Sequence, residues 1–202
     1  MVNIITGKDA IWFTENYDAV LVGTSIYCML TNGFQSKMAI KYPYIDNINN
    51  NTKYGDERKL GKRMTIQGKP VISLLYIAKF PHCKRVFLDY DALEHSLETA
   101  NAEFRGKKLM TTMLGCTRFD GNGDSEKVME IINKTMTDVD LDIYDYPQID
   151  KYKEIDFNID KIRKMRETDA DKYNELWPAR FQILNELYLM PPQTKQKKTI
   201  QY

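Results

Sequence analysis

Residues 71–79 constrain the fold more than any other part of the sequence. They read VISLLYIAK, which is apolar at almost every position. A strand with one face in water alternates apolar and polar residues, whereas a strand covered on both faces is apolar throughout. The run is far shorter than the roughly 18 residues of a membrane-spanning helix. It therefore predicts a central strand of a sheet that is covered by other elements on both faces.

Strand patterns and helix patterns alternate along the first 145 residues, which predicts an α/β fold in layers with a mixed sheet. Residues 67–70, which read QGKP, separate two strand-like runs and predict a hairpin. Residues 44–61 are polar and rich in asparagine, so we expect a loop with little regular structure. The remaining predicted strands are residues 3–6, 19–23, 63–66, 108–114 and 140–144, and the predicted helices are residues 34–41, 90–104 and one from Ser125.

Two predicted helices show a stripe of inward-facing apolar residues. In the first, Leu93, Leu97, Ala100 and Phe104 recur at helical spacing. The second starts at Ser125, where Asp124 is a suitable capping residue, and its inward positions are Val128, Ile131 and Ile132. Both stripes are typical of helices that pack on a sheet.

Composition changes after about residue 150, where charged residues dominate and strand patterns end. We predict three parts: a main domain at residues 1–148, a helical extension at 149–190, and a disordered tail at 191–202. An apolar helical stripe runs through Tyr173, Leu176, Trp177, Phe181, Leu184 and Tyr188. The stripe packs either on the main domain or against a second copy, as a homodimer contact.

Charge and composition exclude several classes of protein. The formal net charge is +1, so no overall field draws the chain to nucleic acid or to an anionic membrane. No apolar run is long enough to span a bilayer, and the first residues do not resemble a signal peptide, so we expect a cytoplasmic protein. The abundance of Asn, Lys, Ile and Tyr suggests an AT-rich genome, with a viral origin as one reading.

The three cysteines are widely spaced and predict reduced thiols, not a disulfide framework. The sequence holds no Cys-x-x-Cys pair, and its only histidines are His82 and His95. Because structural zinc sites draw on such pairs, we expect no metal site. No motif in the sequence predicts a cofactor.

Two predicted strand ends carry the residues of greatest interest. Lys79 ends the buried strand, and residues 115–124, which read GCTRFDGNGD, follow another strand and precede a helix. Ligands of open α/β sheets bind at the carboxyl ends of strands, and glycine loops with helix N-termini bind phosphate oxygens. Ordinary alternatives remain, namely a solvated Lys79 and an Asp120 that bonds its own turn.

Three segments in this order resemble the macro domain family. They are LYIAK at residues 75–79, YDALEHSL at residues 90–97, and GCTRFD at residues 115–120. They are similar to the branch of terminal ADP-ribose protein glycohydrolase and the yeast ADP-ribose-1″-phosphate phosphatase. The resemblance spans residues 2–145 and implies a three-layer α/β/α macro domain with a mixed central sheet. The helical extension follows it.

The sequence departs from the family pattern in three places. The family's opening Gly-Asp reads Gly7-Lys8-Asp9, so the acid that resembles the adenine ligand comes one residue late. Only Gly33 matches the first phosphate loop. The second loop is one residue longer than the family's, which affects the position of Asp120.

The resemblance implies that the chain binds ADP-ribose or an ADP-ribosylated substrate, with nucleic acid as a partner only where it is the modified group. Lys79 would attack the anomeric carbon of the distal ribose, and Asp120 would act as acid and base. This chemistry hydrolyses ADP-ribosyl linkages. The alternatives are a non-catalytic binder of ADP-ribose or an NAD-derived nucleotide, and an ADP-ribose-1″-phosphate phosphatase. The expected ligand-binding residues are Asp9, Thr24, Ser25, Gly33, Phe34, Gly115, Cys116, Thr117, Arg118, Phe119 and Gly121.

Several of these residues also have a plain structural interpretation. Thr24 and Ser25 fit solvent-facing hydroxyls as well as ligand contacts, and Phe34 fits a core position. Cys116 fits a structural role better than that of a nucleophile, because no histidine is an evident partner. Arg118 and Phe119 would either clamp the ligand or cover the loop.

Overall fold

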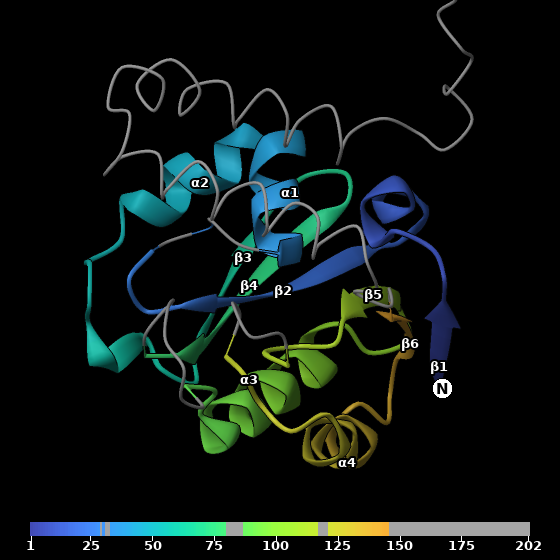
Figure 1. Ribbon diagram of the computed structural model, residues 1–202. Coiled ribbons are helices and arrows are strands. Elements are labelled where there is room, and N and C mark those ends of the chain that lie inside the picture. The colour runs from blue at the N-terminus through green and yellow to red at the C-terminus, as the bar shows by residue number, and fades with distance from the viewer. Residues whose placement is uncertain (29, 31–32, 80–86, 117–120, 146–202) are drawn as a thin grey trace, which may run out of the picture. The chain divides into compact units, whose positions relative to one another are not determined.

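A computed structural model describes residues 1–28, 30, 33–79, 87–116 and 121–145 (Figure 1). The chain divides into two units, Met1–Tyr146 and Pro147–Tyr202. The whole second unit lies outside the described residues, and the predicted helical extension and tail at residues 149–202 lie there with it.

A mixed sheet of six strands forms the centre of the first unit. The strand order is β1-β6-β5-β2-β4-β3, in which β3 is antiparallel to β4 and every other neighbouring pair is parallel. The predicted hairpin and mixed sheet are thus confirmed. The strands are β1 (Val2–Thr6), β2 (Ala19–Ser25), β3 (Arg63–Ile66), β4 (Val71–Ala78), β5 (Lys108–Thr112) and β6 (Asp140–Asp145).

Helices cover both faces of this sheet, which confirms the three-layer α/β/α architecture (Figure 1). On one face lie α1 (Gly33–Lys41) and α2 (Pro43–Asn50), and on the other α3 (Tyr90–Glu103) and α4 (Ser125–Thr135). The strand β4 pairs on both edges and is buried from Ile72 to its end. The prediction of a central strand covered on both faces is therefore correct.

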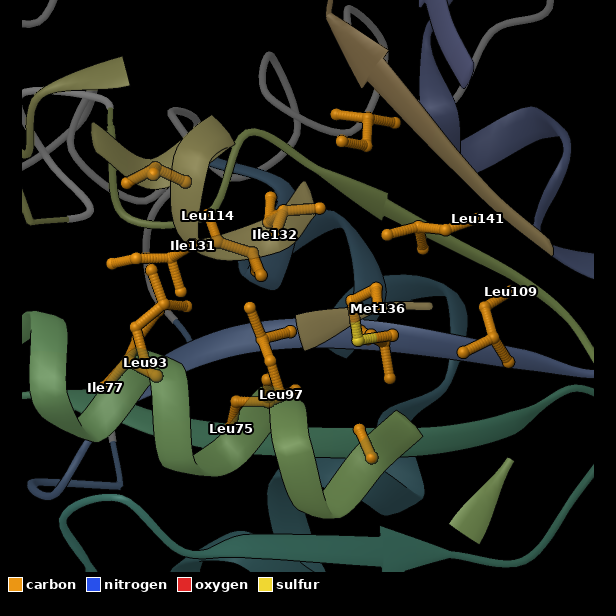
Figure 2. Close-up of a cluster of buried hydrophobic side chains, with 14 of the residues drawn as sticks. Leu75, Ile77, Leu93, Leu97, Leu109, Leu114, Ile131, Ile132, Met136 and Leu141 are labelled. Atoms are coloured by element: carbon orange, nitrogen blue, oxygen red, sulfur yellow. The ribbon is translucent and has the colours of Figure 1, made fainter. Parts of the chain in front are cut away.

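The core under α3 and α4 follows the predicted apolar stripes. Figure 2 shows Leu93 and Leu97 of α3 directed at Leu75 and Ile77 of β4. All four side chains are at most 1% exposed. Truncating a leucine at such a site typically costs about 2–5 kcal/mol of unfolding free energy.

Aspartate side chains begin both helices of this layer. Asp89 Oδ1 accepts a hydrogen bond from Ala92 N at 3.0 Å at the start of α3. Asp124 Oδ1 accepts from Glu126 N at 2.9 Å and from Lys127 N at 3.4 Å at the start of α4. These bonds satisfy amides that have no partner within the helix. The prediction of Asp124 as a helix cap is confirmed.

The prediction of a loop with little regular structure at residues 44–61 is wrong. This segment contains most of α2 and a 3₁₀ turn at Glu57–Lys59. Pro43 occupies the first turn of α2, where its missing N–H has no cost. Ile45 and Asn49 lie four residues apart and are both fully buried. Tertiary contacts on that face offset the weak helix propensity of the asparagines.

The residues that the structure describes contain neither a candidate membrane-spanning helix nor a candidate metal site. None of their helices has both the length and the apolar character to cross a membrane. No three His, Cys, Asp or Glu side chains among them are grouped closely enough to hold a metal ion.

A buried carboxylate network joins β6 to its neighbours. Asp142 Oδ2 accepts from Tyr17 Oη at 2.7 Å, and Asp142 Oδ1 accepts from Asn3 Nδ2 at 3.0 Å. Lys108 Nζ lies 3.6 Å from Asp142 Oδ2. Burial by itself raises the pKa of Asp142, but the bonds from Tyr17 and Asn3, with the Lys108 charge, outweigh it and lower the pKa below 3.8. The native state therefore favours the ionised carboxylate.

Replacing Asp142 with asparagine should destabilise the fold in a pH-dependent manner. A lowered native pKa adds stability that is present above the unfolded pKa and is lost as pH falls through the native pKa. At about pH 7, Asp142→Asn should therefore lower the unfolding free energy by about 1.5–3 kcal/mol. The difference in unfolding free energy between wild type and Asp142→Asn should shrink below about pH 3.8. Denaturant titrations of both proteins, at about pH 7 and below about pH 3.8, measure this difference.

Asp140→Asn is the matched control, because Asp140 is an exposed carboxylate on the same strand. It should change the unfolding free energy by about 0.5 kcal/mol or less. Equal losses for the two variants, or a loss at Asp142 that does not depend on pH, would contradict the role given to the network.

Candidate functional site

The carboxyl ends of β2, β4 and β5 lie along the same edge of the sheet, because the three strands are parallel. Ser25 at the end of β2 pairs with Ala78 at the end of β4, after a shift of register at Thr24. Ile26 N then donates to Ala78 O at 3.0 Å. The loops that leave these strands therefore start side by side, in the position where open α/β sheets bind ligands.

The segment before α3 ties the end of β4 to the glycine-rich loop. Leu88 forms an antiparallel bridge with Ala78, and Asp89 N donates to Ile77 O at 2.9 Å. Phe87 N and Leu88 N both donate to Gly121 O, at 2.7 and 3.1 Å. Leu88 thus contacts the strand that precedes Lys79 and also the loop that contains Asp120.

Glycines close the loop between β5 and α4. Gly123 N donates to Gly115 O at 2.8 Å. Gly115 and Gly121 have φ values of 67° and 142°, in the region that favours glycine. A Cβ on Gly121 would lie 2.6 Å from Gly115 O, and a Cβ on Gly115 would lie 2.7 Å from Leu88 Cδ1. Only residues without a side chain fit this crossing of backbones.

Of the two predicted catalytic residues, the structure describes Lys79 but not Asp120. Lys79 follows β4 directly and is exposed. Asp120 lies outside the described residues, as do Thr117, Arg118 and Phe119, so their roles stay predictions. In the sequence Asp120 precedes Gly121, which is bonded to Leu88.

Asp9 does not present a free carboxylate. Its Oδ2 lies 2.6 Å from Lys37 Nζ, and its Oδ1 accepts from Ile11 N at 3.4 Å. The side chain of Lys37 is only 5% exposed, and that of Asp9 is 21% exposed. The pair holds the turn after β1 against α1. Nothing in the sequence indicated Lys37, because one lysine in a helix is usually solvated.

Thr24 and Ser25 are buried, with exposures of 2% and 4%, so the reading of solvent-facing hydroxyls is wrong. Ser25 Oγ accepts from Tyr27 N at 3.3 Å. Thr24 Oγ1 has no hydrogen-bond partner among the residues that the structure describes. A buried hydroxyl without a partner is uncommon, so the Thr24 hydroxyl has a hydrogen bond still to offer near the end of β2.

Gly33, Phe34 and Cys116 each have a definite place. Gly33 begins α1 with a φ of 52°, and no described residue lies within 4 Å of the position that a Cβ would take. Phe34 is partly buried and packs against the core beneath α1. Cys116 Sγ donates to Leu114 O at 3.4 Å.

No protein-family model matches the sequence. No curated protein matches it significantly. Solved structures do match. The macrodomain of Thermus aquaticus DarG is 12% identical with a TM-score of 0.54, over 72% of this chain and 98% of that chain. The macrodomain of Mycobacterium tuberculosis DarG is 17% identical with a TM-score of 0.53, over 71% and 98%.

Thermosipho africanus DarTG, solved in complex with ADP-ribose, is 13% identical with a TM-score of 0.57. That match covers 73% of this chain and 42% of DarTG. At such low identities the likeness establishes a shared fold and no more.

Gly121→Ala should destabilise the loop crossing strongly. The new methyl group would meet Gly115 O, and the φ of 142° strains any residue with a side chain. We expect a loss of about 3 kcal/mol of unfolding free energy in a denaturant titration. Gly7→Ala is the control, since Gly7 also has a positive φ but open surroundings. It should cost about 1 kcal/mol, and equal losses would contradict the steric argument.

Proposed function

We propose that this chain, which has the macrodomain fold, binds ADP-ribose at the sheet edge formed by the ends of β2, β4 and β5. The observation that carries this proposal is the crossing of Leu88, Gly121 and Gly115, which joins the segment before α3 to the loop between β5 and α4 at that edge. The same fold in Thermosipho africanus DarTG has been solved with ADP-ribose.

The N-terminus of α1 is the better of two candidate sites for the diphosphate. Helix N-termini attract anions through free amides and the helix dipole. At α4 these amides are already bonded to the carboxylate of Asp124, whose charge repels a second anion. At α1 the helix begins at Gly33, and no described residue lies within 4 Å of the position that a Cβ there would take. Thr24, whose hydroxyl has no partner among the described residues, is the penultimate residue of β2, the strand that precedes this helix.

We further propose that the chain hydrolyses an ADP-ribosyl linkage. The Lys79 amine would form a bond to the anomeric carbon of the distal ribose while the bond to the leaving group breaks. Water would then displace the lysine and release ADP-ribose. Because the attack needs an unprotonated amine and the departing group needs a proton, an acid and base must act beside Lys79. Asp120 is the proposed residue.

One observation favours the second candidate, a binder without catalysis. Lys79 is exposed, whereas a catalytic lysine is usually desolvated by its surroundings. Asp9 also differs from a free adenine ligand, because Lys37 holds its carboxylate. Binding and turnover therefore need separate tests.

Calorimetry of the full chain with ADP-ribose tests binding. We expect wild type to bind, and Gly33→Val to weaken binding about tenfold or more, equivalent to about 1.4 kcal/mol. Gly106→Val is the matched control, since Gly106 also has a positive φ and open surroundings but precedes β5 at the opposite sheet edge. An absence of binding by wild type would refute the proposal.

Release of ADP-ribose from an ADP-ribosylated carboxylate tests turnover. Lys79→Ala should lower the rate by roughly 10³-fold, since it removes the nucleophile, and should retain binding. Lys107→Ala, at an exposed lysine before β5, should leave both unchanged. Binding by wild type without turnover would identify a binder. Phosphate release from ADP-ribose-1″-phosphate would identify a phosphatase instead.

A further inference from the structure

A compact polar cluster lies between the turn after β2 and the segment that follows α2. We call it the Cys28 cluster, after the cysteine at its centre. Lys59 Nζ lies 2.9 Å from Cys28 Sγ and 3.0 Å from Thr52 Oγ1. Thr52 Oγ1 lies 3.1 Å from Cys28 Sγ. An amine, a thiol and a hydroxyl are thus in mutual contact, and the proposed function does not use them.

The hydrogen bonds of the Cys28 cluster assign the direction of each proton. Thr52 Oγ1 donates its only proton to Asn49 O at 2.7 Å, so it accepts from both Lys59 and the Cys28 thiol. Lys59 carries only donors, so Cys28 Sγ is an acceptor toward it. The sulfur therefore faces a cation whose proton points at it.

The surroundings keep Cys28 and Lys59 together. Cys28 is 5% exposed and has a φ of 57°, which non-glycine residues seldom adopt. The Lys59 ammonium lies 4.6 Å from the ring centroid of Tyr76, whose hydroxyl donates to Asn49 Oδ1 at 2.8 Å. Asn49 is fully buried, and its Nδ2 has no partner among the described residues.

We propose that Cys28 is a site of oxidation by hydrogen peroxide and that Lys59 captures the oxidised sulfur in a covalent crosslink. An adjacent lysine is one of the features that make a cysteine reactive, and a sulfenic acid condenses with a thiol or with a backbone nitrogen. Here the side-chain nitrogen of Lys59 stands 2.9 Å from the sulfur. This proposal does not rest on the proposed function.

The reaction proceeds in two balanced steps. The Cys28 thiol attacks one peroxide oxygen, so that an S–O bond forms and the O–O bond breaks. The departing hydroxide takes the thiol proton and leaves as water, and the Lys59 ammonium gives one proton to solvent. The neutral amine then attacks the sulfenic sulfur, so that an S–N bond forms and the S–O bond breaks. The hydroxyl takes an amine proton and leaves as a second water. The sulfur is oxidised by two electrons, and the peroxide is reduced.

Mass spectrometry of the full chain tests this proposal, in a Cys83→Ser, Cys116→Ser background that excludes internal disulfides. After treatment with hydrogen peroxide we expect a mass lower by two hydrogen atoms. Digestion should give a peptide that joins Cys28 to Lys59, and a thiol reductant should separate it. Added oxygen atoms without the joined peptide, or an unreacted Cys28, would overturn the proposal.

Two lysine variants locate the nitrogen. Lys59→Arg should lose the crosslink and gain one or more oxygen atoms at Cys28, because a guanidinium is a poor nucleophile that stays protonated. Lys53→Arg changes an exposed lysine next to Thr52 and should still form the crosslink. Crosslinking in Lys59→Arg would overturn the assignment. Where a variant folds poorly, peptide mapping of the oxidised chain with Lys53 and Lys59 both intact still identifies which lysine is joined to Cys28.

Discussion

Burial of β4 on both faces is the constraint on which the rest of the structure depends. Ile72, Leu74 and Tyr76 point to the layer of α1 and α2, whereas Leu75 and Ile77 point to α3 and α4. A strand of this kind is stable only when it pairs on both edges and both helical layers are present. The pairing of β4 with β2 then fixes where their carboxyl ends meet, and Ala78 becomes the anchor for Leu88.

The same strand lies beside both proposed sites. Lys79 follows the last residue of β4 at the edge where the glycine loop arrives, and the ring centroid of Tyr76 lies 4.6 Å from Lys59 Nζ. At Gly115, Gly121 and Gly123 there is no room for side chains beside Leu88.

Periodicity in the sequence predicted the strands, three of the helices and the Asp124 cap, because these depend on local patterns of burial and on capping chemistry. It failed at α2, where the asparagines suggested a loop. There Asn49 is a buried helical residue that accepts a hydrogen bond from Tyr76, a tertiary contact that the sequence does not reveal. It also gave no indication of Lys37 beside Asp9 or of Lys59 beside Cys28. Both pairs join segments about thirty residues apart, so they follow only from the tertiary fold.

On the proposed function, the charges at two helix N-termini would orient the diphosphate. Asp124 satisfies the first amides of α4 and adds a negative charge there, whereas at the start of α1 no described residue lies within 4 Å of the position that a Cβ on Gly33 would take. A diphosphate would therefore lie toward α1, because its charges would be repelled by the carboxylate of Asp124. In this orientation the distal ribose would extend toward Gly115 and the end of β4, which Lys79 follows. The helix cap would then select the orientation of the ligand as well as stabilise α4.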